Sequence, residues 1–263
     1  MRRHVGSLFA VLFLSSCTPG GLQTLQQDLT RAAQEQLKST LAMHFKTEMG
    51  KGLDTVISGL AQTGGYLDNP LVRILLPPPL GLAIGIAHDL SIDPQATLLE
   101  TLINQAAEQA IPGAAPILQT ALSQITPTQA RVLLDGANTA GTEHLKAQTL
   151  ETLQTVLTPI ITEKLGVNGA QQVYSELLTA QQSHYGPPRP EEVAAASAPT
   201  PDLGQYVTQQ AVAGMFDMLG TREASIREDL RSITGSVLQP MGMPPAEPLN
   251  PQAAPAAELP EVK

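Results

Sequence analysis

The chain of 263 residues is short of several residue types that common kinds of protein depend on. It has one cysteine and no tryptophan, with aromatic side chains at 3% and charged side chains at 15%. A single cysteine excludes an internal disulfide, so packing alone must hold the folded chain together. A chain of this length can bury about 70% of the surface that it exposes when unfolded. A packed core is therefore expected without covalent cross-links.

Basic residues are also scarce, at 15 Lys and Arg against 24 Asp and Glu, which gives a formal net charge of −9. They are scattered singly along the chain, whereas phosphate recognition relies on clustered Lys and Arg. We therefore expect no nucleic-acid partner. Apolar residues make up 42% of the chain, and many recur with helical spacing, which excludes disorder throughout.

The amino-terminal segment carries the most specific pattern. Arg2, Arg3 and His4 precede an apolar stretch over 5–14, which is too short for a bilayer span of about 20 residues and is typical of a secretory signal peptide. The stretch runs into Leu14-Ser15-Ser16-Cys17, which resembles the lipobox of bacterial lipoproteins. The alternative is an ordinary core cysteine behind a signal anchor.

The lipobox resemblance implies how the chain would be processed. Residues 1–16 would be removed, Cys17 would receive a diacylglycerol on its sulfur, and its new amino group would be acylated. Two or three acyl chains give stable membrane anchoring, so 17–21 would form a lipidated amino terminus. Thr18 follows the cysteine, and the absence of an Asp at this position resembles lipoproteins that are sorted to the outer membrane in enteric bacteria. We expect a location in the bacterial envelope, facing the periplasm.

Helical periodicity dominates the rest of the chain, and no clear strand alternation is present. The fold class predicted is all-α, an irregular multi-helix bundle over 22–238 with Pro-rich connectors. Gly50 and Gly52 predict a helix end, and Pro159 predicts a kink or a break. Helices are predicted over 22–49, 53–62, 94–110, 127–134, 142–165, 170–183, 203–219 and 226–237. A further short helix is predicted to end at 124.

Three segments are predicted to lie outside regular helices. The stretch 74–87 is the most apolar in the mature chain, but Pro77-Pro78-Pro79 interrupts it, so it is expected to be a buried connector rather than a membrane span. The Pro- and Ala-rich stretch 186–201 is expected to be a loop or a linker between domains. The Pro-rich end 239–263 is predicted to be a disordered tail.

Three blocks of the sequence form an ordered pattern. The first, 52–77, ends in Asn69-Pro70-Leu71-Val72-Arg73-Ile74-Leu75-Leu76-Pro77, the second is 125–136 with the long helix after it, and the third is 206–219 followed by 226–229. Together they resemble a family of bacterial lipoproteins catalogued as domain of unknown function 4197, whose "NPxxRIPLP" segment has a proline where this chain has Leu75. The resemblance implies an exported all-helical domain and brings no activity, cofactor or catalytic residue with it.

Catalytic and metal-binding motifs are missing from the sequence, which has no HExxH, GxSxG, P-loop or dinucleotide-binding glycine pattern. His44 and Glu48, four residues apart, could share a metal, but such pairs are common by chance. Glu143-His144 and His88-Asp89 could serve catalysis, although such pairs more often mark solvated helix ends. We predict no catalytic residues, no metal site and no cofactor beyond the lipid on Cys17.

Three residues are candidate contacts for a ligand or partner. Arg73 lies among apolar residues, so a buried guanidinium there should be paired, with Asp68 or Asp89 as the expected partner. Alternatively, Arg73 presents its fork to an anionic ligand or a partner carboxylate. Asn69 before Pro70 indicates a turn first and a ligand contact second. Tyr206 is expected in the core with a partner for its hydroxyl group.

The leading functional hypothesis is a non-enzymatic lipoprotein that binds an envelope protein or supports envelope organisation. A second hypothesis is a carrier of a lipid or small hydrophobic ligand, in which the stretch 74–87 would wall a cavity between helices. A third is an enzyme whose site, around Arg73, a histidine and a carboxylate, assembles only in three dimensions.

Overall fold

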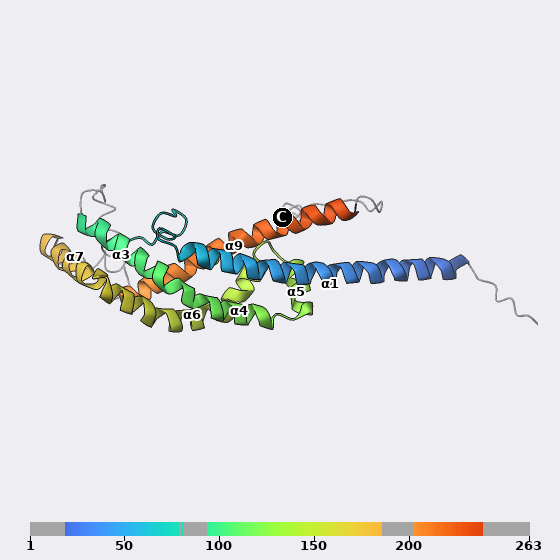
Figure 1. Cartoon of the computed structure of the whole chain (residues 1–263), viewed down its shortest axis with the longest axis horizontal. Helices are drawn as coiled ribbons and strands as arrows, with labels where there is room; N and C mark the ends of the chain where they lie inside the picture. The colour runs from blue at the N-terminus through green and yellow to red at the C-terminus, as the bar shows by residue number, and fades with distance from the viewer. Residues whose placement is uncertain (1–18, 79, 81–93, 186–201, 239–263) are drawn as a thin grey trace, which may run out of the picture.

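The regular secondary structure that the chain forms is helical throughout its described part, which confirms the all-α class (Figure 1). The computed structural model describes 19–78, 80, 94–185 and 202–238, with side chains over 31–78, 80, 94–180 and 202–232. The predictions for the signal peptide, Cys17, His88-Asp89, the stretch 186–201 and the tail 239–263 fall outside these residues. The helices are α1 (Pro19–Leu60), α3 (Pro94–Ala110), η2 (Ile111–Ala114), α4 (Ala115–Gln124), α5 (Pro127–Leu134), α6 (Ala140–Val167), α7 (Ala170–Tyr185) and α9 (Leu203–Leu238).

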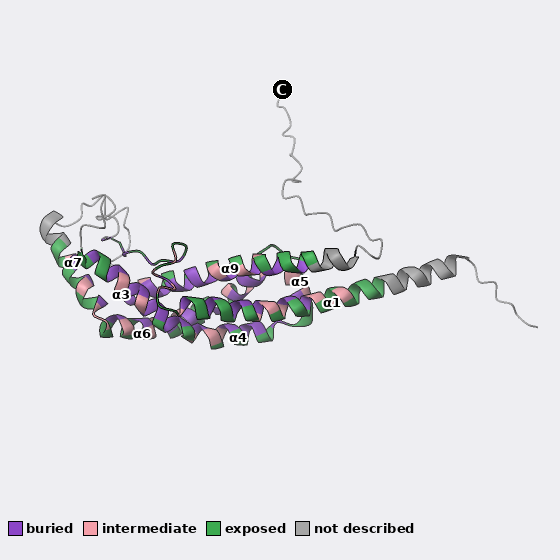
Figure 2. Ribbon diagram, turned by 45° about the horizontal axis from the view of Figure 1, so that its top comes forward, coloured by how far each residue is buried: buried purple, intermediate pink, exposed green. Residues whose placement is uncertain are grey.

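Three long helices, α1, α6 and α9, set the elongated shape of the molecule (Figure 1). Helix α9 packs along both α1 and α6, while α3 and α4 pack against α6, and α5 lies against α1. Figure 2 shows the amino-terminal part of α1 extending beyond the other helices. Its side chains over 31–36 are accordingly exposed, and burial begins at Ala42 and Phe45. Among the described side chains of α1, the predicted packing face is buried from Ala42 onward.

The predicted helix end at Gly50 and Gly52 is wrong, since α1 is one continuous helix of 42 residues. The two glycines instead allow close packing. A Cβ on Gly52 would lie 3.0 Å from Arg222 Cγ, and one on Gly50 would lie 3.3 Å from Leu122 Cδ2. A helical glycine costs about 1 kcal/mol relative to alanine, and the burial that this close approach permits offsets that cost.

The predicted separation of the last two helices is also wrong, because α9 is continuous over 36 residues. The apolar residues that recur with helical spacing are interrupted between Leu219 and Ile226, as they would be between two separate helices. In the structure the polar side chain in this interval, Glu223, is 0% exposed and faces the junction of α5 and α6. The pattern is broken because the buried contact there is polar.

Pro159 was predicted to kink or break its helix, and it does not break it, since α6 continues through this residue. Pro159 lies on the exposed side of the helix. The carbonyl that loses its hydrogen bond to a proline can therefore bind water there. Its opposite face is buried and follows the helical period, with Leu145, Leu153, Leu157, Ile161 and Leu165 each at most 1% exposed.

The predicted helix starts are confirmed where capping residues mark them. Thr126 accepts a hydrogen bond from the Gln129 amide at 3.3 Å, and Gln129 Oε1 accepts one from the Thr126 amide at 2.9 Å, which completes a capping box for α5. Asp202 Oδ1 accepts a hydrogen bond from the Gln205 amide at 2.9 Å at the start of α9. Local side-chain chemistry thus fixes where these helices begin.

A buried ion pair on α9 binds the ends of two other helices. Glu223 accepts hydrogen bonds from the Gly141 and Thr142 amides at 2.9 and 2.7 Å, which are free donors at the start of α6. Arg227 donates to the Leu133 and Leu134 carbonyls at 2.8 Å, in the last turn of α5. Each charge therefore meets the helix end of complementary polarity.

The two side chains also bind each other, and both are buried. Arg227 Nη2 donates to Glu223 Oε1 at 2.6 Å, and their side chains are 3% and 0% exposed. The guanidinium lies 4.7 Å from the centre of the Phe45 ring of α1. This pair thus joins α1, α5, α6 and α9 at one point, and we refer to it as the junction pair.

Replacing Glu223 with glutamine should lower the free energy of unfolding by about 3–5 kcal/mol, because Arg227 would remain buried without a countercharge. Urea unfolding followed by circular dichroism measures this change. Glu228→Gln on the same helix is the matched control, since that side chain is 75% exposed, and it should leave the midpoint nearly unchanged. Equal effects of the two variants would contradict the assigned role of the junction pair.

Candidate functional site

The segment 66–77, which we call the strap, follows α1 and contains all but one of the candidate contact residues (Figure 1). Its side chains alternate, with Val72, Ile74 and Leu76 buried against the core. The residues between them face outward, and Leu71 and Leu75 are 75% and 60% exposed. This two-residue alternation was too short, and too close to prolines, to be recognised as extended structure in the sequence.

Three buried polar residues on α3 hold the strap in place. Glu108 Oε1 accepts hydrogen bonds from the Tyr66 and Leu67 amides at 3.2 and 3.3 Å. Asn104 accepts from the Ile74 amide at 2.9 Å and donates to the Ile74 carbonyl at 2.8 Å, as a neighbouring strand would. Glu100 completes the series by binding the side chain of Arg73.

Sequence analysis missed these three residues, which we call the α3 ladder (Glu100, Asn104 and Glu108). Residues four apart lie on the same side of a helix, so this spacing places all three along one line beside the apolar stripe. All are at most 5% exposed. Polar residues that recur every fourth position at the border of an apolar helix face were the signal that could have revealed them.

The sequence left two roles open for Arg73, an internal ion pair or a contact with a ligand or partner. The structure shows an internal ion pair, with Glu100 in place of the expected Asp68 or Asp89. Arg73 Nε donates to Glu100 Oε1, and neither Asp68 nor the undescribed Asp89 provides the observed contact. The side chain of Glu100 is 7% exposed, whereas that of Arg73 is 44% exposed. The role of Arg73 as a partner contact stays a prediction, and the pair holds its exposed part in a defined position.

Asn69 and Tyr206 both fasten the strap to the bundle. Asn69 Oδ1 accepts a hydrogen bond from the Leu71 amide at 3.1 Å, which confirms the predicted turn, and its Nδ2 lies 3.8 Å from Met218 Sδ. Tyr206 packs partly buried against the core, and its hydroxyl donates to the Leu75 carbonyl at 3.1 Å. Burial raises the pKa of Tyr206 above its ordinary value.

Tyr66 was not singled out from the sequence, yet it is the largest fully buried side chain of the strap. Its hydroxyl donates to the Ala211 carbonyl of α9 at 2.9 Å. Burial, and after it the negative charge of Glu108, raises the pKa of Tyr66 far above its ordinary range. It therefore acts as a neutral anchor between the strap and α9.

The structure describes two of the three histidine pairs, His44 with Glu48 and Glu143 with His144, and places both at least partly exposed. His44 Nδ1 lies 3.9 Å from Glu48 Oε1, and the His44 side chain is 49% exposed. Glu143 is exposed in the first turn of α6, as expected of a solvated helix end, and His144 contacts Gln148 at 3.0 Å. Within the described residues, no group of three or more potential ligands is positioned to hold a metal ion.

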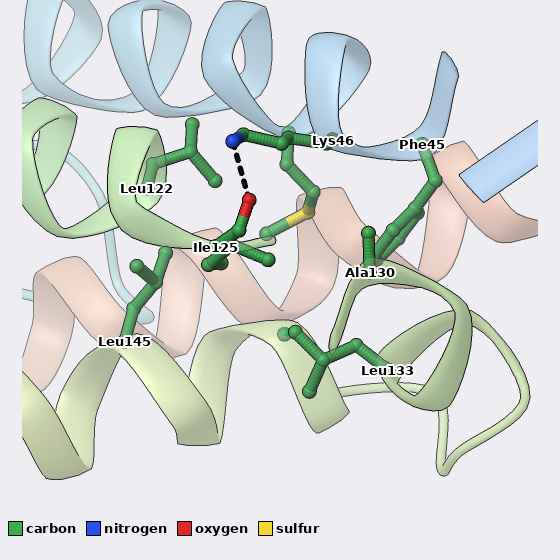
Figure 3. Close-up of a pocket in the computed structure, with 9 residues that line it drawn as sticks. Phe45, Lys46, Leu122, Ile125, Ala130, Leu133 and Leu145 are labelled. Carbon is green, nitrogen blue, oxygen red and sulfur yellow. Dashed lines mark hydrogen bonds between the residues drawn. The ribbon is translucent and has the colours of Figure 1, made fainter. Parts of the chain in front are cut away.

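Two hollows differ greatly in size. The enclosed one lies between α1, α4, α5 and α6 and holds about 10 Å³, and Figure 3 shows Lys46 reaching across it to the Ile125 carbonyl, at 2.6 Å. The other is an open groove of about 540 Å³ between the end of α1, the turn after it and α9. None of the helices in the described part is long and apolar enough to cross a bilayer.

A family model described as "Protein of unknown function (DUF4197)" matches residues 23–241. The chain belongs to this family. The match contains all three sequence blocks, the α3 ladder and the junction pair, and it confirms the resemblance inferred from the sequence. No curated protein and no solved structure matches the chain. Membership of this family assigns the chain no activity and no ligand, because the family itself is described as having no known function.

Replacing Asn104 with alanine should destabilise the protein by about 2 kcal/mol or more, because the buried amide and carbonyl of Ile74 would lose their partners. Hydrogen exchange at the Ile74 amide should accelerate with this change. Asn138→Ala removes an exposed amide that binds only Arg231 at 2.9 Å, so it serves as the control. Unchanged exchange at Ile74 in the Asn104 variant would contradict the ladder.

Proposed function

We propose that this protein is an exported, lipid-anchored envelope protein whose helical bundle binds a protein partner or supports envelope organisation without catalysis of its own. The observation that carries the proposal is the position of the lipobox cysteine. Cys17 stands two residues before Pro19, where α1 begins, and α1 continues without a break into the bundle. An acyl anchor on this cysteine would thus be joined to the core through one helix.

The geometry of α1 suits such a tether. A helix rises 1.5 Å per residue, so roughly 35 Å of helix precedes Ala42, the first fully buried residue among those of α1 whose side chains are described. The side chains over 31–36 are exposed, although a helix of a compact bundle would bury part of its face there. An exposed helical stalk would hold the bundle away from the lipid headgroups.

The use of the buried charges supports a binding or structural role. Glu223 and Arg227 bind helix ends, Glu108 binds strap amides and Glu100 binds Arg73. These groups are engaged by their own chain, whereas catalysis would need them to face a substrate. The outward side of the strap combines Leu71, Arg73 and Leu75 and is the proposed partner surface, with Asn69 and Tyr206 supporting it from behind.

The carrier hypothesis placed its cavity at the stretch 74–87, but the feature that supports it is the open groove between α1 and α9. Ile74, Leu76 and Leu80 pack into the core, and the enclosed hollow of about 10 Å³ holds no more than a single water. The open groove of about 540 Å³ is within the range of small-molecule sites, about 300–1,000 Å³. The groove between α1 and α9 is therefore the place where we expect a small ligand to bind.

Replacing Cys17 with serine should move the protein from the membrane fraction to the soluble fraction, because serine cannot form the thioether to diacylglycerol. Fractionation with an alkaline wash, followed by mass spectrometry of the amino terminus, measures the change. Ser16→Ala keeps a small residue before the cysteine and should remain at the membrane. Retention of the serine variant at the membrane would refute the anchor.

A photo-reactive amino acid at position 75 should capture a discrete envelope protein in living cells, because Leu75 is 60% exposed on the proposed partner surface. The same amino acid at position 132 is the control, since Val132 is 68% exposed on α5, away from the strap. Immunoblotting measures the cross-linked species. Identical patterns at both positions, or no product at either, would argue against the strap as a partner surface.

A further inference from the structure

Arg73 leaves most of its hydrogen-bonding capacity unused. Its Nε donates to Glu100 Oε1, and within the described part of the chain neither Nη1 nor Nη2 donates to an acceptor. Arg227 differs, because its Nε, Nη1 and Nη2 all donate to groups of the bundle. A guanidinium can hold a carboxylate through two parallel hydrogen bonds. The Nη edge of Arg73 therefore suits a second carboxylate besides that of Glu100.

The Nη edge belongs to an accessible side chain with apolar neighbours. The Arg73 side chain is 44% exposed, although the side chain of Glu100 that holds it is only 7% exposed. Leu71 and Leu75, two residues before and two residues after Arg73, are 75% and 60% exposed. Side chains two apart lie on the same face of an extended segment. One cation thus stands between two exposed leucines on the outward side of the strap.

The strap is fastened to two helices, so this surface is ordered before a partner binds. Asn104 of α3 binds the amide and the carbonyl of Ile74 at 2.9 and 2.8 Å. The Tyr206 hydroxyl of α9 donates to the carbonyl of the next residue, Leu75, at 3.1 Å. Binding on the outward side would therefore cost little conformational entropy in the strap itself.

The chemistry of this surface restricts the kind of partner. Arg73 is the only basic residue in the sequence of the strap, and the chain carries a formal net charge of −9, so a partner with clustered negative charges is disfavoured. A single carboxylate needs only one guanidinium. The two leucines match apolar side chains placed two residues before and two residues after that carboxylate in an extended chain.

We infer that the outward side of the strap binds an extended segment of a partner protein in which one Asp or Glu is flanked, at alternate positions, by apolar residues. The carboxylate accepts hydrogen bonds from Arg73 Nη1 and Nη2, and the apolar side chains pack against Leu71 and Leu75. The inference rests on the proposed function, because it gives the chemistry of the partner that the strap would bind. Glu100 positions Arg73 through Nε, and its negative charge weakens the attraction of the guanidinium for a second carboxylate.

Two fluorescein-labelled, amidated heptapeptides serve as probes, Thr-Leu-Thr-Glu-Thr-Leu-Thr and the same peptide with Gln in place of Glu. The protein is the whole mature chain, 17–263, with Cys17→Ser, so that no acyl chain or detergent is present. Fluorescence anisotropy measures the two dissociation constants. We expect the glutamate peptide to bind about tenfold more tightly than the glutamine peptide, because only the carboxylate forms the charge-assisted pair.

Two variants break the same ion pair with opposite expected results. Arg73→Gln should abolish the preference for the glutamate peptide, because the guanidinium is lost. Glu100→Gln should keep or increase the preference, since the guanidinium stays and the competing negative charge is removed. Arg73→Lys retains a cation beside Glu100, and hence the fold, but lacks the planar fork, so the preference should fall to about threefold.

A second pair of variants tests the apolar contacts. Leu71→Ser should weaken the binding of both peptides by about fivefold and leave their ratio unchanged, because it removes apolar surface without a charge. Val132→Ser is the matched control, since Val132 is 68% exposed on α5, and it should alter neither dissociation constant.

The inference is overturned if the two peptides bind equally well, if neither binds, or if Arg73→Gln retains the preference. It is also overturned if the chain alone forms a dimer that Arg73→Gln dissociates, because the surface would then belong to a second copy. The proposed function fails separately, through the absence of a cross-linked protein at position 75. A protein captured there equally well with and without Arg73→Gln would leave the proposed function standing and refute the inference.

Discussion

The fold depends on one buried ion pair, Glu223 with Arg227, which satisfies the ends of two helices at once. Removing two charges from water costs several kcal/mol, and mutual attraction alone seldom repays this. Here the free amides at the start of α6 and the carbonyls in the last turn of α5 supply the remaining hydrogen bonds. The pair therefore fixes the turn between α5 and α6 against α9, and the contact with Phe45 adds α1 to the same point.

Other polar side chains of the bundle act in a similar way. Asn104 and Glu108 of the α3 ladder bind backbone groups of the strap, and Glu100 binds the side chain of Arg73. Lys46 of α1 donates to the Ser123 carbonyl of α4 and to the Ile125 carbonyl that follows this helix, the second of which Figure 3 shows. A core with aromatic residues at only 3% of the chain has few large, shaped side chains to set helix register. These directional hydrogen bonds supply that constraint instead.

Much of the fold could be predicted because its signals are local. The capping box at Thr126 and Gln129 depends on neighbours three residues apart, and the sequence contains both partners. Gly52 and the partner of Arg73 could not be predicted in this way. Whether Gly52 ends a helix or admits Arg222 depends on a residue 170 positions away in the sequence, and Glu100 reaches Arg73 only after α3 has packed. The groove was invisible for the same reason, since its walls come from α1, the turn after it and α9.

The continuity of α9 explains how the groove and the junction can coexist. Arg222 and Glu223 are adjacent, so a helix turns their side chains about 100° apart, one toward the groove with α1 and the other toward the start of α6. A helix end in this interval would free the two positions from each other. Because α9 runs through, the junction pair that fixes its rotation also fixes how Arg222 packs against Gly52 of α1. The same rotation places Met218 against Asn69, so the turn that carries the strap forms the opposite wall of the groove.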